Sequence, residues 1–164
     1  MTDVKVCGLT RESDVEAACE LGAAYVGFNF ASDSPRRIDL GTGRQLARAV
    51  PPGVRRVGVF VEESYQEIAD AIGAASLDVV QIHRTLRDED LERIPRAVLA
   101  VAHAGHDDEI PGAAMLERCA GILFDAWAPG LPGGSGVTFD WSRLEGRRWP
   151  VPMFVAGGLR AENV

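Results

Sequence analysis

The sequence predicts an α/β fold around a parallel sheet, and three observations lead to that prediction. Seven apolar runs rich in Val, Ile and Phe recur about 24 residues apart, the length of a strand, a helix and two short loops. The runs do not alternate strictly with polar residues, which is typical of strands buried on both faces. Helix-like stretches separate several of them, so we expect repeated βα units with right-handed crossovers.

Each expected strand is a short run followed by a small loop. In chain order the runs are Val4–Cys7, Ala24–Phe30, Arg56–Val61, Asp78–His83, Val98–Ala102, Gly121–Phe124 and Val151–Ala156. Two architectures fit this series, a doubly wound open sheet and a (β/α)8 barrel, and the barrel needs eight units. In both architectures ligands bind at the carboxyl ends of the strands.

Two helices are marked by residues typical of helix ends. Ser13 and Glu16 have the spacing of a capping box, so we expect a helix to begin at Ser13 and to stop at Gly22. A second capping box at Ser64 opens an apolar stripe that we expect Gly73 to close. Glycines and a proline between residues 105 and 112 interrupt any helix there.

The composition of the 164 residues is that of an ordinary globular domain, with 46% hydrophobic and 25% charged residues. The net charge of −7 makes nucleic acid an unexpected partner. No apolar stretch is long enough to span a bilayer, so a membrane partner is not expected either. Three cysteines without a CxxC pair are typical of a reducing compartment, and we therefore expect a cytoplasmic protein.

Two reactive side chains stand at the ends of expected strands. Cys7 ends the first run, where a thiolate base could meet substrate; the alternative is a small core residue. Asp125 follows the apolar sixth run, and a carboxyl beside apolar groups can keep a proton to donate near neutral pH. The alternative for Asp125 is a hydrogen bond to the next loop.

Four further residues at these ends are candidates for substrate binding. Arg36 has a fork that fits a carboxylate, although Arg37 beside it leaves a solvated basic pair as the alternative. His83 is either a substrate contact or a hydrogen-bonded core histidine. Gly157 and Gly158 let backbone N–H groups approach an anion such as phosphate, and a tight turn is their alternative use.

Neither a metal site nor a dinucleotide site is expected. His103, His106, Asp107 and Asp108 lie close together in one glycine-containing stretch, which we interpret as a solvated loop because no second ligand group has suitable spacing. The dinucleotide fingerprint GxGxxG after a strand and the phosphate-binding GxxxxGK[ST] are both absent.

A series of short motifs runs in one order along essentially the whole chain. They are Lys5–Arg11, Gly27–Phe30, Ser34–Arg36, Val57–Val61, Gln81–His83, Phe124–Ala126, Gly133–Gly136, Phe139–Trp141, Ala156–Leu159 and Glu162–Val164. Together these motifs resemble the phosphoribosylanthranilate isomerase family. Their joint occurrence is far more specific than any single motif.

The resemblance implies a (β/α)8 TIM barrel of tryptophan biosynthesis, an isomerase that uses no metal or organic cofactor. The family converts the phosphosugar N-(5-phosphoribosyl)anthranilate to 1-(2-carboxyphenylamino)-1-deoxyribulose 5-phosphate by an Amadori rearrangement. Carried over by motif, Cys7 would be the general base and Asp125 the general acid. Arg36 would hold the anthranilate carboxylate, and Gly157 with Gly158 would form part of the phosphate site.

Three departures from the family pattern bear on these expectations. Arg84 stands where a glycine is usual and would put a cation beside the site, and Val137 stands where a lysine is frequent. The family's eighth strand is missing, so we expect residues 1–164 to be a single barrel domain truncated after strand seven. The alternative function is a non-catalytic remnant that needs a partner to complete the fold. The oligomeric state stays open.

Overall fold

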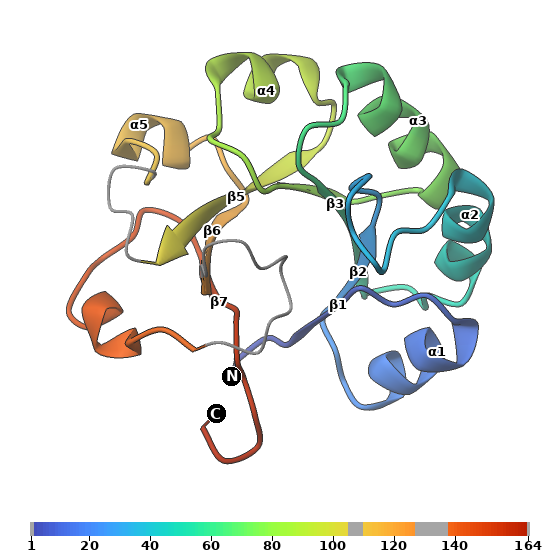
Figure 1. Ribbon diagram of the computed structural model, residues 1–164, viewed down its shortest axis with the longest axis horizontal. Helices are drawn as coiled ribbons and strands as arrows, with labels where there is room; N and C mark the ends of the chain where they lie inside the picture. The colour runs from blue at the N-terminus through green and yellow to red at the C-terminus, as the bar shows by residue number, and fades with distance from the viewer. Residues whose placement is uncertain (1, 105–109, 127–137, 164) are drawn as a thin grey trace.

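The computed structural model describes residues 2–104, 110–126 and 138–163, and in these ranges seven strands form one parallel sheet. The strands follow one another in chain order around the sheet, and the helices lie outside it (Figure 1). They are β1 (Lys5–Cys7), β2 (Tyr25–Asn29), β3 (Arg55–Phe60), β4 (Val79–Ile82), β5 (Ala97–Ala104), β6 (Gly121–Ala126) and β7 (Met153–Val155). All seven expected strands are confirmed. A doubly wound sheet would reverse its strand order, so the sequential order decides for the barrel.

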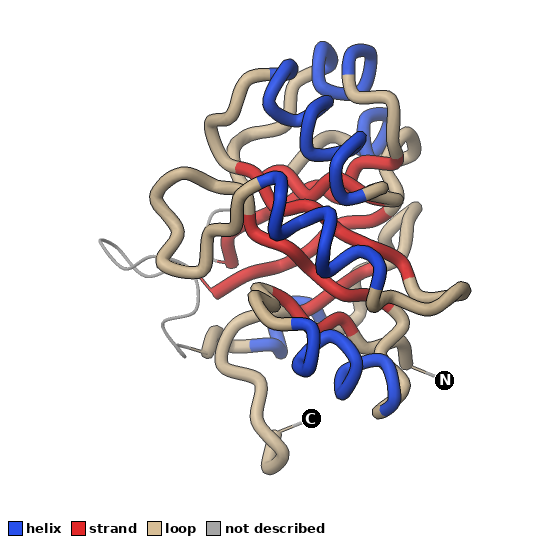
Figure 2. Tube along the Cα trace, turned by 90° about the vertical axis from the view of Figure 1, so that its right-hand side faces the viewer, coloured by secondary structure: helices blue, strands red, loops and turns tan. Residues whose placement is uncertain are grey.

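The helices connect successive strands and cover the outer face of the curled sheet (Figure 2). They are α1 (Glu12–Glu20), α2 (Leu40–Arg48), α3 (Tyr65–Ala75), α4 (Asp88–Arg93), α5 (Ala113–Leu116) and the 3-10 helix η2 (Trp141–Leu144). The brevity of α5 agrees with the glycines and proline that precede it. Within the described ranges, no helix has the length and apolar character needed to cross a membrane.

The first helix begins at a different residue from the one predicted. Arg11, not Ser13, is the N-cap of α1, and the Ser13 hydroxyl donates to Asp14 at 3.4 Å instead of capping a backbone N–H. The predicted stop at Gly22 is confirmed, because Gly22 has a φ of +88° just after the helix and its N–H donates to the Cys19 carbonyl.

The capping box at Ser64 is confirmed, whereas the predicted stop at Gly73 is wrong. The Ser64 side chain accepts from the backbone of Glu67, and the Glu67 side chain accepts from the backbone of Ser64. Helix α3 continues through Gly73 to Ala75 and ends at Ser76 with a φ of +48°. Ala75 is fully buried, and burial of this last turn offsets the cost of about 1 kcal/mol for a glycine inside a helix.

Apolar side chains fill two spaces, one on each face of the sheet. The larger cluster lies between the outer face and the helices and includes Phe28, Leu46 and Phe60. The smaller cluster lies inside the curve of the sheet and consists of Val57, Val79, Leu99, Val101 and Leu123, with Tyr25, Phe154 and Ala156 packed against it. Strand residues alternate between the two faces of the sheet. The residue two positions further along each strand therefore points to the same inner face, one layer closer to the carboxyl end.

These next inward positions are polar. Val79 is followed at two-residue intervals by Gln81 and His83, and Leu123 is followed by Asp125. In the described residues, β1 pairs only with β2 and β7 only with β6, so the sheet curls around these polar groups without a β1–β7 ladder. The apolar inner layer therefore forms a floor beneath a polar rim.

Candidate active site

A cavity of about 540 Å³ opens at the carboxyl ends of the strands, and its size is ordinary for a small-molecule site. It is lined by all six residues that the sequence predicts for the site: Cys7, Arg36, His83, Asp125, Gly157 and Gly158. These residues come from both ends and the middle of the chain. The fold therefore brings the whole predicted set to one rim.

Cys7 is the last residue of β1 and lines the cavity together with Lys5, two positions earlier on the same face. Its sulfur lies against Gly27 of β2, where an added Cβ would come within 2.7 Å of it. A larger residue at position 27 would displace the thiol. Cys7 is half-buried at the cavity wall, whereas Cys119 is buried and its thiol donates to the Met115 carbonyl at 3.4 Å.

The Arg36 guanidinium is held beside Cys7 by a hydrogen bond. Its Nη1 donates to the Cys7 carbonyl at 2.9 Å, and the guanidinium occupies the space that a side chain at Gly8 would fill. Gly8 has a φ of +78°, a conformation that favours glycine. Arg36 is solvent-exposed, and this hydrogen bond fixes the position of its guanidinium at the edge of the cavity.

Asp125 lies on β6 directly opposite His103 of β5. Burial raises the pKa of Asp125 above its ordinary value, although a backbone hydrogen bond at Ala126 and electrostatic interactions with His103 and Lys5 oppose the shift. A carboxyl group with a raised pKa keeps its proton to higher pH. This is the property that a general acid near neutral pH requires.

His83 follows β4 and is held in its neutral form. Burial, followed by the charges of Lys5 and His103, lowers the pKa of His83 to about 4. The side-chain amide nitrogen of Gln81 donates to Nε2 of His83, which places the imidazole proton on Nδ1. His83 is therefore a half-buried, hydrogen-bonded histidine that also lines the cavity.

Gly157 and Gly158 form a tight turn after β7, with φ values of +88° and +63°. A Cβ at Gly157 would collide with Ala126, the residue after Asp125, so the turn approaches β6 closely. Asn163 holds the loop: its Nδ2 donates to the Gly158 carbonyl at 3.0 Å, and its Oδ1 accepts from the Arg160 N–H at 2.6 Å. Backbone N–H groups in turns of this kind form anion-binding concavities.

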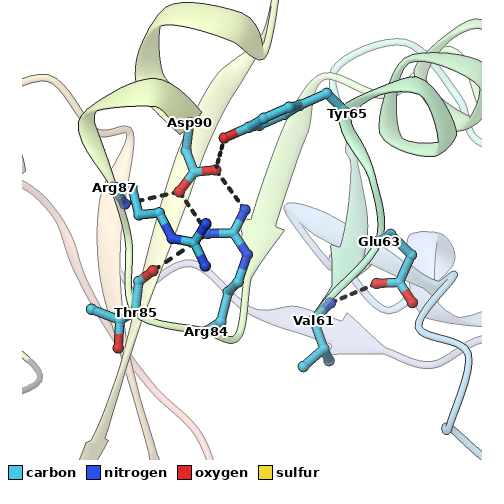
Figure 3. Close-up of polar contacts among 7 residues, drawn as sticks. All are labelled: Val61, Glu63, Tyr65, Arg84, Thr85, Arg87 and Asp90. Carbon is cyan, nitrogen blue, oxygen red and sulfur yellow. Dashed lines mark hydrogen bonds and ion pairs between the residues drawn. The ribbon is translucent and has the colours of Figure 1, made fainter.

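Arg84 does not line the cavity, which corrects the expectation of a cation beside the site. Its guanidinium makes two hydrogen bonds to the buried Asp90, at 2.6 and 2.7 Å (Figure 3). Asp90 also accepts from the Tyr65 hydroxyl and from the Arg87 backbone N–H. The charge of Arg84 is balanced within the connection from β4 to α4.

The interpretation of residues 103–108 as a solvated loop is wrong for His103. This residue is part of β5 and pairs with Asp125 of β6. Residues 106–108, the glycine-rich segment 130–136 and Val137 lie outside the described residues. In the part of the chain that is described, no three His, Cys, Asp or Glu side chains come together as metal ligands.

Comparison with known proteins identifies the family. Residues 4–164 match the family model described as N-(5'phosphoribosyl)anthranilate (PRA) isomerase. The N-(5'-phosphoribosyl)anthranilate isomerase of Streptococcus gordonii is 43% identical over 166 residues, which cover all of this chain and 80% of that protein. This chain belongs to the phosphoribosylanthranilate isomerase family. A second isomerase, from Pseudomonas aeruginosa, is 41% identical over 98% of this chain and 76% of its own length.

Solved structures of phosphoribosylanthranilate isomerases share the fold. The Thermotoga maritima structure has a TM-score of 0.87 and 35% identity, covering all of this chain and 80% of that one. A structure in complex with reduced 1-(o-carboxyphenylamino)-1-deoxyribulose 5-phosphate has a TM-score of 0.83 and 31% identity, covering 99% and 79%. The fold is therefore a (β/α)8 barrel of which this chain provides strands one to seven.

Sequence reasoning missed polar residues that line this isomerase's cavity or order its rim. Lys5 lines the cavity, and its place two residues before Cys7 in an apolar strand was an available signal. Glu63 accepts a backbone hydrogen bond from Val61 at 2.7 Å (Figure 3). It also accepts one from Ser32 at 2.8 Å, and so joins the loops after β3 and β2. Nothing in the local sequence indicates that Glu63 reaches a loop 31 residues away.

Proposed function

We propose that this chain catalyses the isomerisation of N-(5-phosphoribosyl)anthranilate to 1-(2-carboxyphenylamino)-1-deoxyribulose 5-phosphate with Cys7 as base and Asp125 as acid. The observation that carries the proposal is that both side chains line one cavity, with Arg36 bonded to the Cys7 carbonyl. Relatives matched across essentially the whole chain are named as this enzyme, so a non-catalytic remnant is not favoured.

Asp125 starts the reaction in this proposal. It donates its proton to the furanose ring oxygen, the ring C–O bond breaks, and the nitrogen lone pair forms a protonated Schiff base at C1′. The raised pKa of Asp125, caused by burial, supports the role because the carboxyl must hold a proton before it can donate one. The neutral His83 in the same cavity adds no charge that would favour early ionisation of the acid.

Cys7 completes the reaction. Its thiolate removes the proton from C2′, and the electron pair of that C–H bond neutralises the Schiff base to give an enolamine, which tautomerises to the ketone. Acid and base act on different atoms of one sugar, so they must approach it from different strands. The positions of Cys7 on β1 and Asp125 on β6 support this division of roles.

The two anionic ends of the substrate require two separate sites. Arg36, beside Cys7, is suited to the anthranilate carboxylate because a guanidinium pairs with a carboxylate through two parallel N–H groups. Gly157 and Gly158 are suited to the phosphate through their backbone N–H groups. With its ends held at these positions, the sugar would lie between acid and base.

The proposal also includes the domain organisation, the partners and the cellular location. Residues 1–164 are a single barrel domain that lacks the eighth βα unit, with a small phosphosugar as substrate and no metal, organic cofactor, nucleic acid or membrane required. A cytoplasmic location fits the three cysteines without a CxxC pair, and the net charge of −7 fits the lack of a nucleic-acid partner.

The test is turnover of freshly prepared phosphoribosylanthranilate by the purified 164-residue chain, followed by the loss of substrate fluorescence. We expect turnover in the wild type and a loss of at least about 1,000-fold in kcat for Cys7→Ala and for Asp125→Asn. Cys19→Ala, on the helix α1, is the matched control and should keep wild-type kcat. Normal turnover in either cavity variant would contradict the assigned roles.

A further inference from the structure

Gln81 is a cavity residue to which the proposed mechanism assigns no task. It lies on β4 two residues before His83, is 2% exposed and lines the cavity. Its amide nitrogen donates to His83, but its amide oxygen, Oε1, has no hydrogen-bond partner in the described part of the chain. Buried polar atoms are nearly always paired, so an unpaired acceptor at a ligand cavity points to a donor on the ligand.

The bond to His83 also determines the chemistry of the free atom. The structure places the NH2 end of the Gln81 amide against Nε2 of His83, and this orientation leaves the amide oxygen as the unpaired group. An amide oxygen can only accept a hydrogen bond. The ionised carboxylate and phosphate of the proposed substrate offer no donor. Its donors are the hydroxyl groups of the sugar and the N–H that joins C1 to the anthranilate ring.

We propose that Gln81 is a substrate-binding residue whose Oε1 accepts a hydrogen bond from the hydroxyl on C3 of the sugar. The inference rests on the proposed function. The reaction changes bonds at C1, C2 and the ring oxygen, and it leaves the C3 hydroxyl unaltered from substrate to product. Gln81 lies on the inner face between Val59 of β3 and Leu99 of β5, just above the apolar floor, where the middle of the substrate would rest.

This placement predicts how the residue affects kinetics. A hydrogen bond to an unaltered hydroxyl is present in the substrate complex and in the transition state alike, so its loss raises KM and leaves kcat nearly unchanged. We expect a rise in KM of about tenfold in Gln81→Met, the effect of one neutral hydrogen bond.

The test is equilibrium binding of two ligands to the full chain: reduced 1-(o-carboxyphenylamino)-1-deoxyribulose 5-phosphate, and its analogue without the C3 hydroxyl. The wild type should bind the first about tenfold more tightly than the second. Gln81→Met should bind both equally, whereas Gln81→Glu, which keeps an acceptor oxygen, should retain the preference. Gln45→Met, on the exposed face of α2, is the matched control and should match the wild type.

The outcomes distinguish the assignment of Gln81 from the proposed isomerase function on which it rests. If Gln81→Met keeps the tenfold preference, or the wild type has none, the assignment of Gln81 is overturned while isomerisation by Cys7 and Asp125 stands. If the wild type binds neither ligand and shows no turnover, the proposed function is contradicted and the assignment of Gln81 with it.

Discussion

At the scale of single residues, the buried Asp90 shows how one carboxylate stabilises a connection. Burial opposes its ionisation, yet hydrogen bonds from Arg84, from the Arg87 N–H and from Tyr65 outweigh burial and lower the pKa of Asp90. We expect Asp90→Asn to reduce the free energy of unfolding by about 3–5 kcal/mol, because it leaves the Arg84 charge without its partner. Urea denaturation at pH 7 measures the change.

The exposed pair between Asp88 and Arg118 provides the matched control for that measurement. Its atoms are 2.7 Å apart, but both side chains are solvent-exposed. Asp88→Asn should therefore cost less than about 1 kcal/mol. If the Asp88 and Asp90 variants lost equal amounts of unfolding free energy, burial would not strengthen the Arg84–Asp90 pair.

Asp125 is expected to weaken the fold for the sake of its reactivity. Its folded-state pKa is raised by burial, so its contribution to stability is complete below the unfolded value of about 3.9 and is lost as pH rises through the folded value. Asp125→Asn should therefore increase the free energy of unfolding at pH 7, with the difference vanishing near pH 3. A variant less stable than the wild type at pH 7 would contradict this account.

At the scale of structural elements, the turn after β7 depends on Gly157 for two reasons. Its φ is +88°, and a Cβ there would collide with Ala126. Gly157→Ala should lower kcat/KM at least tenfold, because the turn must shift away from the proposed phosphate position and from Asp125. Steady-state kinetics with phosphoribosylanthranilate measures the effect.

Gly53 is the control that distinguishes backbone strain from steric collision. Its φ is +95°, but a Cβ at this position would meet no atom within 4 Å. Gly53→Ala should lose about 1 kcal/mol of stability from backbone strain and keep its kcat/KM. If Gly157→Ala likewise lost only stability, the close approach of this turn to β6 would have no part in the site.

At the scale of the whole molecule, the strands and the site could be predicted because both follow from periodic signals. Buried parallel strands read as apolar runs, and their carboxyl ends meet at one rim, so Cys7 and Asp125 could be placed together without coordinates. Helix ends were harder: Ser13 has a local alternative in Asp14, and the burial of Ala75 overrides the stop at Gly73.

Features that depend on contacts distant in sequence were not accessible from the chain alone. The turning of Arg84 toward Asp90 is set by a buried carboxylate on the next helix, and a motif that ends at His83 does not reveal it. The free oxygen of Gln81 likewise appears only when its neighbours on β3 and β5 are known. Such contacts determine the orientation of a side chain and whether its charge is paired, whereas the periodicity of the sequence predicts only where the residue lies in the fold.

The central claim is that Cys7 and Asp125 act on one sugar in one cavity, and the most direct measurement is a crystal structure of this chain with the reduced product analogue. We expect the Cys7 sulfur about 3–3.5 Å from C2, and the Asp125 carboxyl within hydrogen-bond distance of the oxygen that leaves the ring. An analogue bound in the cavity with either side chain out of reach of the sugar, or bound elsewhere on the barrel, would contradict the account.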